Sequence, residues 1–284
     1  MTLLTFLVDW LRRLSIQFST RLPHVATYTR ELPVSLERMY ENALDGEHLP
    51  WLHHDSFASM TILDQGPWGW RAKGHFQPAS FMTWLELELR LDRDNNRWVT
   101  TTLRGLGKGT QVITHAVPLA EDRIKVIVDF YVPKLPRFLH RLYAGQFIDT
   151  YAKLYDEDLS MMATRQRELD RVGEGSSSVA DRELSLGELD TLRRSLPFEF
   201  ELQNRPYRVV DVDGELVAHA TTCPHMLGPL QDAPIEQGQV VCPWHGYRFD
   251  VRTRECTRGQ RCRLPPAPEL IVTGPSQEVI ARLI

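Results

Sequence analysis

The most informative stretches of the chain are TTCPHMLGPL, residues 221–230, and VCPWHGYRFD, residues 241–250. They contain Cys223-x-His225 and Cys242-x2-His245, with sixteen residues between the two motifs. Two thiolates and two imidazoles from matched loops favour a [2Fe–2S] cluster, with Cys223 and Cys242 on one iron and His225 and His245 on the other. Imidazole ligands raise the reduction potential of such a cluster into a range of about −150 to +300 mV.

A zinc site is the alternative for two Cys and two His. Zinc fingers usually place both Cys in one loop and both His in another, whereas each loop here contributes one of each. Gly228, Pro229, Pro243 and Gly246 also suit tight loops whose backbone amides point at bridging sulfides. The pattern therefore favours an iron–sulfur cluster over zinc.

The two loops closely resemble those of the Rieske family, which read C-P-H and C-P-x-H-G-x-x-F-D. Respiratory Rieske proteins carry one further Cys in each loop, and these two Cys form a disulfide. Here Leu227 or Gly228 and Trp244 stand at those positions. The resemblance is therefore to the low-potential Rieske domains of ferredoxins and oxygenases. Met226 departs from the basic residue that related loops often carry.

A second candidate metal site lies in ENALDGEHLPWLHH, residues 41–54. Asn42, Asp45, His48 and His53 have the spacing N-x2-D-x2-H-x4-H, which resembles the mononuclear iron motif of Rieske non-haem oxygenases. The H-x-P-x-x-H-H variant present here is most similar to the branch that contains pheophorbide a oxygenase. Two His five residues apart are weak evidence alone, and the cluster motif downstream gives them weight.

Non-haem Fe(II) oxygenases use two imidazoles and one carboxylate on one face of the iron, which leaves positions open for O₂ and substrate. The third ligand is expected from the helix that closes the domain. There YDEDLSMMATRQ, residues 155–166, resembles the family's E-D-x7-Q segment, and its carboxylate ligand maps to Asp158. Asp156 and Glu157 remain alternatives, because acidic residues on a helix are usually just solvated.

Asp45 matches the acidic residue that, in this family, lies between a cluster His and an iron His. A carboxylate that accepts hydrogen bonds from both imidazoles orients each ring and couples proton position to redox state. The resemblance thus implies that Asp45 bridges the two metal sites without being a ligand. Asn42 belongs to the same motif and is a candidate catalytic residue, although an Asn there can also satisfy a helix end.

The segment around these motifs predicts an α+β domain. Helical spacing covers Leu32–Leu44, with Ser35 as a cap, and returns from about Phe138 to Leu169. Between them, strands are predicted at roughly Ser59–Leu63, Trp68–Phe76, Phe81–Leu91, Arg97–Leu106, Gln111–Pro118 and Arg123–Tyr131. An antiparallel sheet that curls around the last helix is similar to the START/Bet v1 helix-grip fold, and such a layout suits an apolar small molecule.

Four segments are predicted along the chain: an N-terminal arm (1–30), a mononuclear iron domain (31–170), a linker (171–188) and an all-β Rieske domain (189–284). MTLLTFLVDWLRRLSIQF predicts an amphipathic helix that covers the protein's own core or makes a subunit contact, with peripheral membrane attachment as the alternative. RVGEGSSSVADRE is small and polar, which is typical of a linker. DVDGEL, residues 211–216, predicts a hairpin.

The family usually places the Rieske domain first, whereas here it comes last. Metal chemistry depends on the geometry of the site and not on the order of the domains. The reversed order leaves two arrangements open. One is the family's homotrimer, in which each cluster serves the iron of a neighbouring subunit, and the other is electron transfer within one chain.

The composition and motifs of the chain limit the kinds of binding partner that can be expected. The chain has 284 residues and a formal net charge of −4, without a basic stripe for nucleic acid or an apolar run that could span a bilayer. The chain has four Cys, and metal ligation in a reducing, cytoplasmic compartment is expected for at least two of them, whereas Cys256 and Cys262 are interpreted as ordinary thiols. No dinucleotide fingerprint or flavin motif is present. Electrons should therefore come from a separate ferredoxin or NAD(P)H-dependent reductase.

The resemblance implies the terminal component of a monooxygenase or dioxygenase. Such an enzyme would use O₂ at His48, His53 and Asp158 to hydroxylate, dealkylate or desaturate an apolar small molecule. The alternative is a Rieske electron-transfer protein fused to a lipid-binding-like domain that holds no mononuclear iron.

Overall fold

The computed structural model describes residues 22–173, 182–259 and 261–283. They form two compact units, and the boundary between the units falls within one long helix, between Met162 and Ala163. The amphipathic helix expected in residues 1–18 and residues 174–181 of the expected linker lie outside the described residues. Within the described ranges, no helix is long and apolar enough to cross a membrane.

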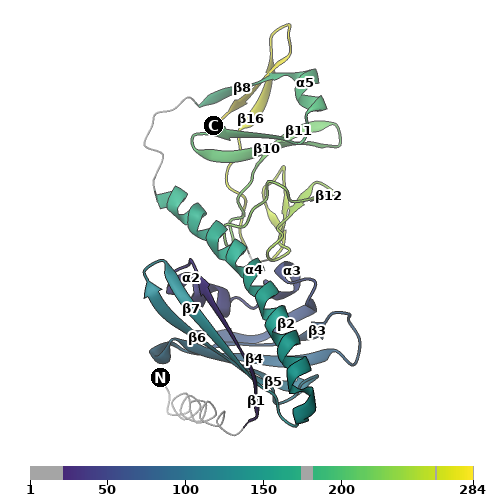
Figure 1. Ribbon diagram of the computed structural model, residues 1–284. Coiled ribbons are helices and arrows are strands. Elements are labelled where there is room, and N and C mark those ends of the chain that lie inside the picture. Colours follow the sequence, from purple (N-terminus) through teal and green to yellow (C-terminus); the bar gives the residue numbers. More distant parts are fainter. Residues whose placement is uncertain (1–21, 174–181, 260, 284) are drawn as a thin grey trace, which may run out of the picture. The chain divides into compact units, whose positions relative to one another are not determined.

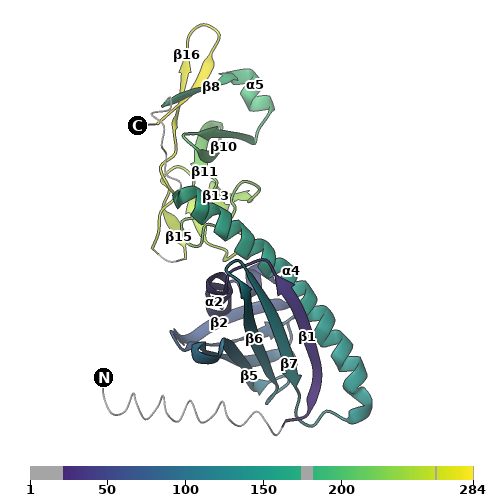
Figure 2. The same cartoon turned by 60° about the vertical axis from the view of Figure 1, so that its left-hand side comes forward.

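The first unit is built on an antiparallel sheet with the strand order β1-β7-β6-β5-β4-β3-β2. Its strands are β1 (His24–Leu32), β2 (Phe57–Gly66), β3 (Gly69–Phe76), β4 (Trp84–Asp92), β5 (Arg97–Gly105), β6 (Gln111–Ala120) and β7 (Arg123–Tyr131). Its helices are α2 (Leu36–Leu44), α3 (Leu49–Leu52) and α4 (His140–Gly173), with 3-10 turns at Arg93–Asn95 and Arg137–Leu139. Helix α4 lies along one face of the sheet (Figures 1 and 2). This helix-grip layout confirms the predicted fold class.

Aromatic contacts fix the face that α4 turns to the sheet. Phe130 of β7 is fully buried, stacks on Phe147 of α4 and meets Tyr151 edge-on, both at 4.8 Å between ring centroids. One turn further along α4, Tyr155 stacks on Tyr28 of β1 at 5.8 Å. Each such pair contributes about 0.5–1.5 kcal/mol beyond the burial of its area. Because residues three apart share a helix face, this packing also turns Asp158 inward.

Strand β1 was not predicted. Residues 24–32 were expected to be the end of the arm and the start of a helix, but they pair with β7, with Tyr28 opposite Val128 and Leu32 opposite Ile124. The predicted helix therefore begins at Leu36 and not at Leu32. Pro33 explains the difference, because the residue before a proline is disfavoured in the helical region. Ser35 then caps α2, as expected, by accepting a hydrogen bond from the Arg38 N–H at 3.2 Å.

The second unit contains three small antiparallel sheets, in the orders β11-β10-β9, β12-β13-β14-β15 and β16-β17-β8. Their strands are β8 (Glu183–Glu188), β9 (Phe198–Leu202), β10 (Arg205–Val212), β11 (Glu215–Ala220), β12 (Ile235–Glu236), β13 (Gln239–Val241), β14 (Arg248–Asp250), β15 (Cys256–Arg258), β16 (Glu269–Thr273) and β17 (Glu278–Arg282). Apart from the short helix α5 (Leu189–Arg194) and the end of α4, the described part of this unit is built of strands and loops.

The predicted DVDGEL hairpin joins β10 to β11. Val212 pairs with Glu215, and the two turn residues between them, Asp213 and Gly214, have φ values of 56° and 86°. These positive values are typical of a tight hairpin turn.

Strand β8 lies within residues 171–188, the segment interpreted as linker. It pairs with β17, with Leu184 opposite Ala281. The alternation in ELSLGE explains this strand, because it buries Leu186 against the core of the second unit.

Candidate metal centres

A one-turn helix positions two imidazoles in the first unit. His48 immediately precedes α3 and His53 immediately follows it, with Pro50 in the first turn, where a missing N–H breaks no hydrogen bond. The His53 N–H donates to the Leu49 carbonyl at 3.2 Å, which closes the turn. The two rings are almost completely buried, and their centroids lie 5.1 Å apart. This turn brings both rings to the same side of the chain.

Asp158 approaches the two imidazoles from α4. Its Oδ1 lies 3.1 Å from His53 Nε2 and 3.5 Å from His48 Nε2, and one ligand atom from each of the three residues fits within 4.8 Å. Two neighbouring ligands at about 2.1 Å from one metal ion are separated by about 3 Å. The three side chains therefore fit a single metal ion, and two imidazoles with one carboxylate are the donor set of non-haem Fe(II) sites.

The other two motif residues lie at the edge of this group. Asn42 of α2 is buried and donates from Nδ2 to Asp158 Oδ1 at 2.9 Å, so it holds the carboxylate rather than capping its own helix. Asp45 ends α2, and its Oδ2 lies 3.5 Å from His48 Nδ1, at the outer limit of a hydrogen bond. Both residues therefore contact members of the candidate iron site.

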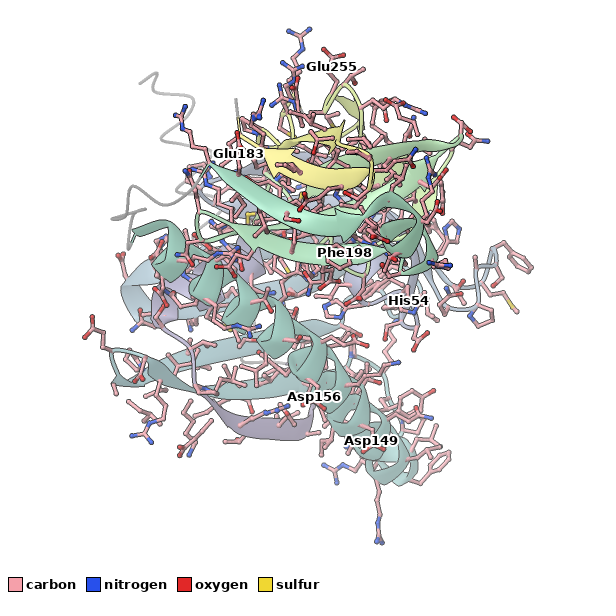
Figure 3. The ribbon with its side chains drawn as sticks, turned by 90° about the horizontal axis from the view of Figure 1, so that it is seen from above. His54, Asp149, Asp156, Glu183, Phe198 and Glu255 are labelled. Atoms are coloured by element: carbon pink, nitrogen blue, oxygen red, sulfur yellow. The ribbon has the colours of Figure 1, made fainter. Side chains whose placement is uncertain are left out.

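The three neighbouring carboxylates of α4 take different positions. Only Asp158 joins the group that could hold a metal. Glu157 Oε2 lies 2.6 Å from His53 Nδ1, on the side of the ring away from Asp158. Asp156 is 66% exposed and pairs with Arg30 at 2.6 Å, and Figure 3 shows it on α4. Glu157 was considered only as a rival ligand, and its contact with His53 could not be read from the sequence.

The three groups depend on each other electrostatically. Burial by itself lowers the pKa of His48, but the carboxylates of Asp158 and Asp45 outweigh it and raise the pKa to about 10. Burial opposes ionisation of Asp158 as well, yet the two imidazoles hold the pKa of Asp158 well below its usual range. The site thus favours an ionised Asp158 next to a positive charge. A metal cation bound by the imidazoles can supply that charge in place of a proton on His48.

Glu157→Gln is expected to weaken binding of Fe(II) at this site by about 10–100-fold, the usual effect of losing a carboxylate that orients a ligating His. A carboxylate on Nδ1 fixes the tautomer that leaves the Nε2 lone pair for metal. Titration of the metal-free protein with Fe(II) measures the change. Asp156→Asn is the matched control, because that neighbouring carboxylate is exposed. Equal affinities in the two variants would contradict the orienting role.

In the second unit, the two Cys–His loops have matching backbone geometry. The Cys223 N–H donates to the Gly228 carbonyl and the Cys242 N–H to the Tyr247 carbonyl, both at 2.8 Å. The residues four positions after each Cys, Leu227 and Gly246, both adopt left-handed conformations, with φ of 60° and 64°. The two loops are therefore copies of one turn, as their similar sequences predicted.

The four predicted cluster ligands lie together. The rings of His225 and His245 are 4.6 Å apart, and both Nδ1 atoms are buried. Cys223 and Cys242 are buried and in hydrogen-bonding contact, which raises the pKa of Cys223 above that of an ordinary thiol, with burial adding to the shift. Two thiolates this close need positive charge between them, and ferric iron supplies it. The donor set fits a [2Fe–2S] cluster.

Neighbouring side chains support these loops. Tyr247 stacks on His225 at 4.4 Å between ring centroids, a contact the sequence analysis did not predict. Beside Cys223, the Thr222 hydroxyl donates to Glu168 Oε2 at 3.1 Å and accepts from Arg171 Nη2 at 3.2 Å. The end of α4 therefore holds the first loop in place through Thr222.

Gly228→Ala is expected to destabilise the Rieske loops by about 1–3 kcal/mol, because the added methyl overpacks them. Its Cβ would lie 3.0 Å from the Trp244 ring and 3.1 Å from Cys242 Sγ. Urea unfolding, with the cluster absorbance as one probe, measures the loss. Gly145→Ala, on α4 with nothing within 4 Å of the added Cβ, serves as control and should stabilise slightly. A neutral Gly228→Ala would show that the loops can open without cost.

Comparison with known proteins agrees with this geometry in the second unit. Residues 183–268 match the family model of the Rieske [2Fe-2S] domain. The chain therefore carries a Rieske domain, as predicted, and such a domain implies a [2Fe–2S] cluster. No curated protein matches the chain.

Three solved structures resemble parts of the chain. Norcoclaurine synthase from Thalictrum flavum is 20% identical over 52% of this chain and 90% of its own, with a TM-score of 0.41. A START superfamily protein from Mycobacterium smegmatis is 18% identical over 49% of this chain and 99% of its own, with a TM-score of 0.40. The ferredoxin of carbazole 1,9a-dioxygenase from Nocardioides aromaticivorans IC177 is 24% identical over 36% of this chain and 100% of its own, with a TM-score of 0.32.

Proposed function

We propose that this chain is the terminal component of a Rieske-type non-haem iron oxygenase. The observation that carries the proposal is the buried group of His48, His53 and Asp158 in a chain that also contains a Rieske domain. When bound, Fe(II) at these residues would activate O₂, and the [2Fe–2S] cluster would supply single electrons.

The surrounding residues hold the ligands in place and keep water out. Asn42 orients the carboxylate of Asp158, and Glu157 orients the ring of His53. Phe57 lies against His53, with 6.4 Å between the ring centroids, and Met162, four residues after Asp158 on α4, is buried in the core of the first unit. These apolar neighbours favour an apolar small molecule as the substrate, to be hydroxylated, dealkylated or desaturated.

The alternative is an electron-transfer protein without mononuclear iron. It gives no reason for three ionisable side chains to share one buried site, since burying charges is costly unless they serve a partner or a metal. The geometry therefore favours the oxygenase.

Electrons are proposed to come from a separate ferredoxin or NAD(P)H-dependent reductase and to reach the iron site through Asp45. Their delivery within one chain or between subunits of a homotrimer stays a prediction. So does membrane contact through residues 1–18.

Asp45→Ala tests the electron path. The variant is expected to keep both metal sites loaded but to lose turnover, because Asp45 contacts His48 from outside the ligand group. Protein with a reduced cluster is mixed with O₂ and substrate, and re-oxidation of the cluster is followed by its absorbance. We expect slow re-oxidation in the variant and rapid re-oxidation in the unmodified protein. Re-oxidation at the normal rate with normal product would rule out Asp45 as the path.

A further inference from the structure

Two cysteines outside the cluster loops face each other across a short antiparallel pairing. Cys256 begins β15, and its N–H donates to the Cys262 carbonyl at 3.3 Å. Beside them Glu255 forms an antiparallel bridge with Arg263, and the Leu264 N–H donates to the Arg254 carbonyl at 2.8 Å. This register places Cys256 directly opposite Cys262.

The spacing of such a pair suits a disulfide. Hydrogen-bonded residues directly opposite each other in an antiparallel pairing have Cα atoms about 5.5 Å apart. A disulfide requires Cα atoms about 4.4–6.8 Å apart. The Cys256 thiol donates to the Arg258 carbonyl at 3.3 Å and is also near enough to Cys262 to raise the pKa of the Cys262 thiol. The backbone register of the pair is therefore compatible with a disulfide between Cys256 and Cys262.

The pair is open to solvent and borders the cluster loops. Cys256 and Cys262 are both partly exposed, whereas Cys223 and Cys242 are buried. Cys256 pairs with Phe249 of β14, the strand that follows the second cluster loop. A small reagent in solution can thus reach this pair, while the two cluster cysteines stay covered.

The residues around Cys256 and Cys262 carry mainly positive charge, which favours a negatively charged reagent. Residues 251–265, VRTRECTRGQRCRLP, contain five Arg and a single acidic residue, Glu255. Arg258, Arg261 and Arg263 are exposed, whereas Arg252 pairs with Glu215 at 2.8 Å and with Asp213 at 3.3 Å. Figure 3 shows Glu255 at the rim of the second unit. Such a basic surface raises the local concentration of anions.

We propose that Cys256 and Cys262 form a reversible dithiol–disulfide site that reacts with anionic low-molecular-weight disulfides, such as glutathione disulfide. One Cys thiolate attacks a sulfur of the reagent and releases one thiol, which leaves a mixed disulfide on the protein. The second Cys then attacks the protein sulfur of the mixed disulfide and releases the second thiol. The two Cys lose two electrons and two protons, and the reagent takes them up as two thiols.

The test uses the full chain with its cluster in place. The protein is incubated with glutathione disulfide, quenched with acid, alkylated and weighed by mass spectrometry, while the visible absorbance reports the cluster. We expect a product that takes up two alkyl groups where the untreated chain takes up four, with a Cys256–Cys262 cross-link, an intact cluster before the quench and full reversal by dithiothreitol. Cys262→Ser should instead keep a glutathione adduct on Cys256. Persistent adducts on the unmodified chain, unreacted thiols, or a cross-link through Cys223 or Cys242 would each overturn the proposal.

Cystamine, a dication with the same reactive bond, tests the charge preference. At low ionic strength it should react at least about tenfold more slowly than glutathione disulfide, and added salt should reduce the difference. Equal rates at low salt would overturn the assignment to anionic disulfides.

Discussion

Asp158→Ala is expected to remove the mononuclear iron and abolish oxygenase turnover while leaving the absorption of the Rieske cluster unchanged. Asp158 supplies the single carboxylate of the ligand group, and its Oδ1 faces both imidazole Nε2 atoms. The cluster loops belong to the other unit. Iron analysis together with the visible spectrum measures both effects in one sample.

Two further variants distinguish loss of the iron ligand from unfolding of the domain. Removing one partner from a buried charged group typically costs about 3–5 kcal/mol, so the alanine variant will also unfold more easily. Asp158→Asn keeps the shape and a hydrogen-bonding oxygen, and it should fold yet still lose the iron. Asp149→Ala, an exposed position on the same helix, should change nothing. Full iron in Asp158→Asn, with iron lost in a Glu157 or Asp156 variant, would move the third ligand.

His245→Cys is expected to lower the midpoint potential of the cluster. A thiolate adds negative charge where a neutral imidazole stood, and clusters with Cys ligands only have potentials near about −400 mV. The ring of His245 lies 4.6 Å from that of His225, so the new sulfur would enter the same ligand group. Protein-film voltammetry measures the shift.

The matched control for this change is His54→Cys. The His54 side chain is 71% exposed in the first unit, and this substitution should leave the potential where it is. An unchanged or higher midpoint in His245→Cys, with the cluster still present, would show that His245 is not a ligand.

Segments with a regular hydrophobic pattern could be predicted, because burying one face of a strand or helix requires apolar residues at regular intervals. The strand Arg123–Tyr131 was predicted with the observed bounds, since its alternate residues are buried. Strand β1 alternates less clearly, because only Ala26 and Leu32 are buried and the charged Arg30 occupies one of its less exposed positions. The helix pattern after Pro33 also follows it directly. The pairing of β1 with β7 connects residues about a hundred positions apart, and such a contact leaves no local mark.

Some residues of the candidate sites could likewise be predicted from local sequence motifs, and others could not. Cys223, His225, Cys242 and His245 stand in two short loops with characteristic spacing, and the structure brings their side chains together. His48 and His53 are similarly local, being joined by one turn of helix. The contacts of Glu157 with His53 and of Tyr247 with His225 depend instead on the orientation of helix α4 and of the Tyr247 ring. Only the packing of the whole unit sets these orientations.

The iron content of the chain tests the central claim most directly. The protein is reconstituted anaerobically with Fe(II) and sulfide, freed of loosely bound metal, and analysed for iron and acid-labile sulfide per chain. The oxygenase account predicts three irons and two sulfides, with one iron held by His48, His53 and Asp158 and two in the cluster. Two irons with two sulfides, under conditions where the first unit is folded, would contradict it and leave an electron-transfer protein.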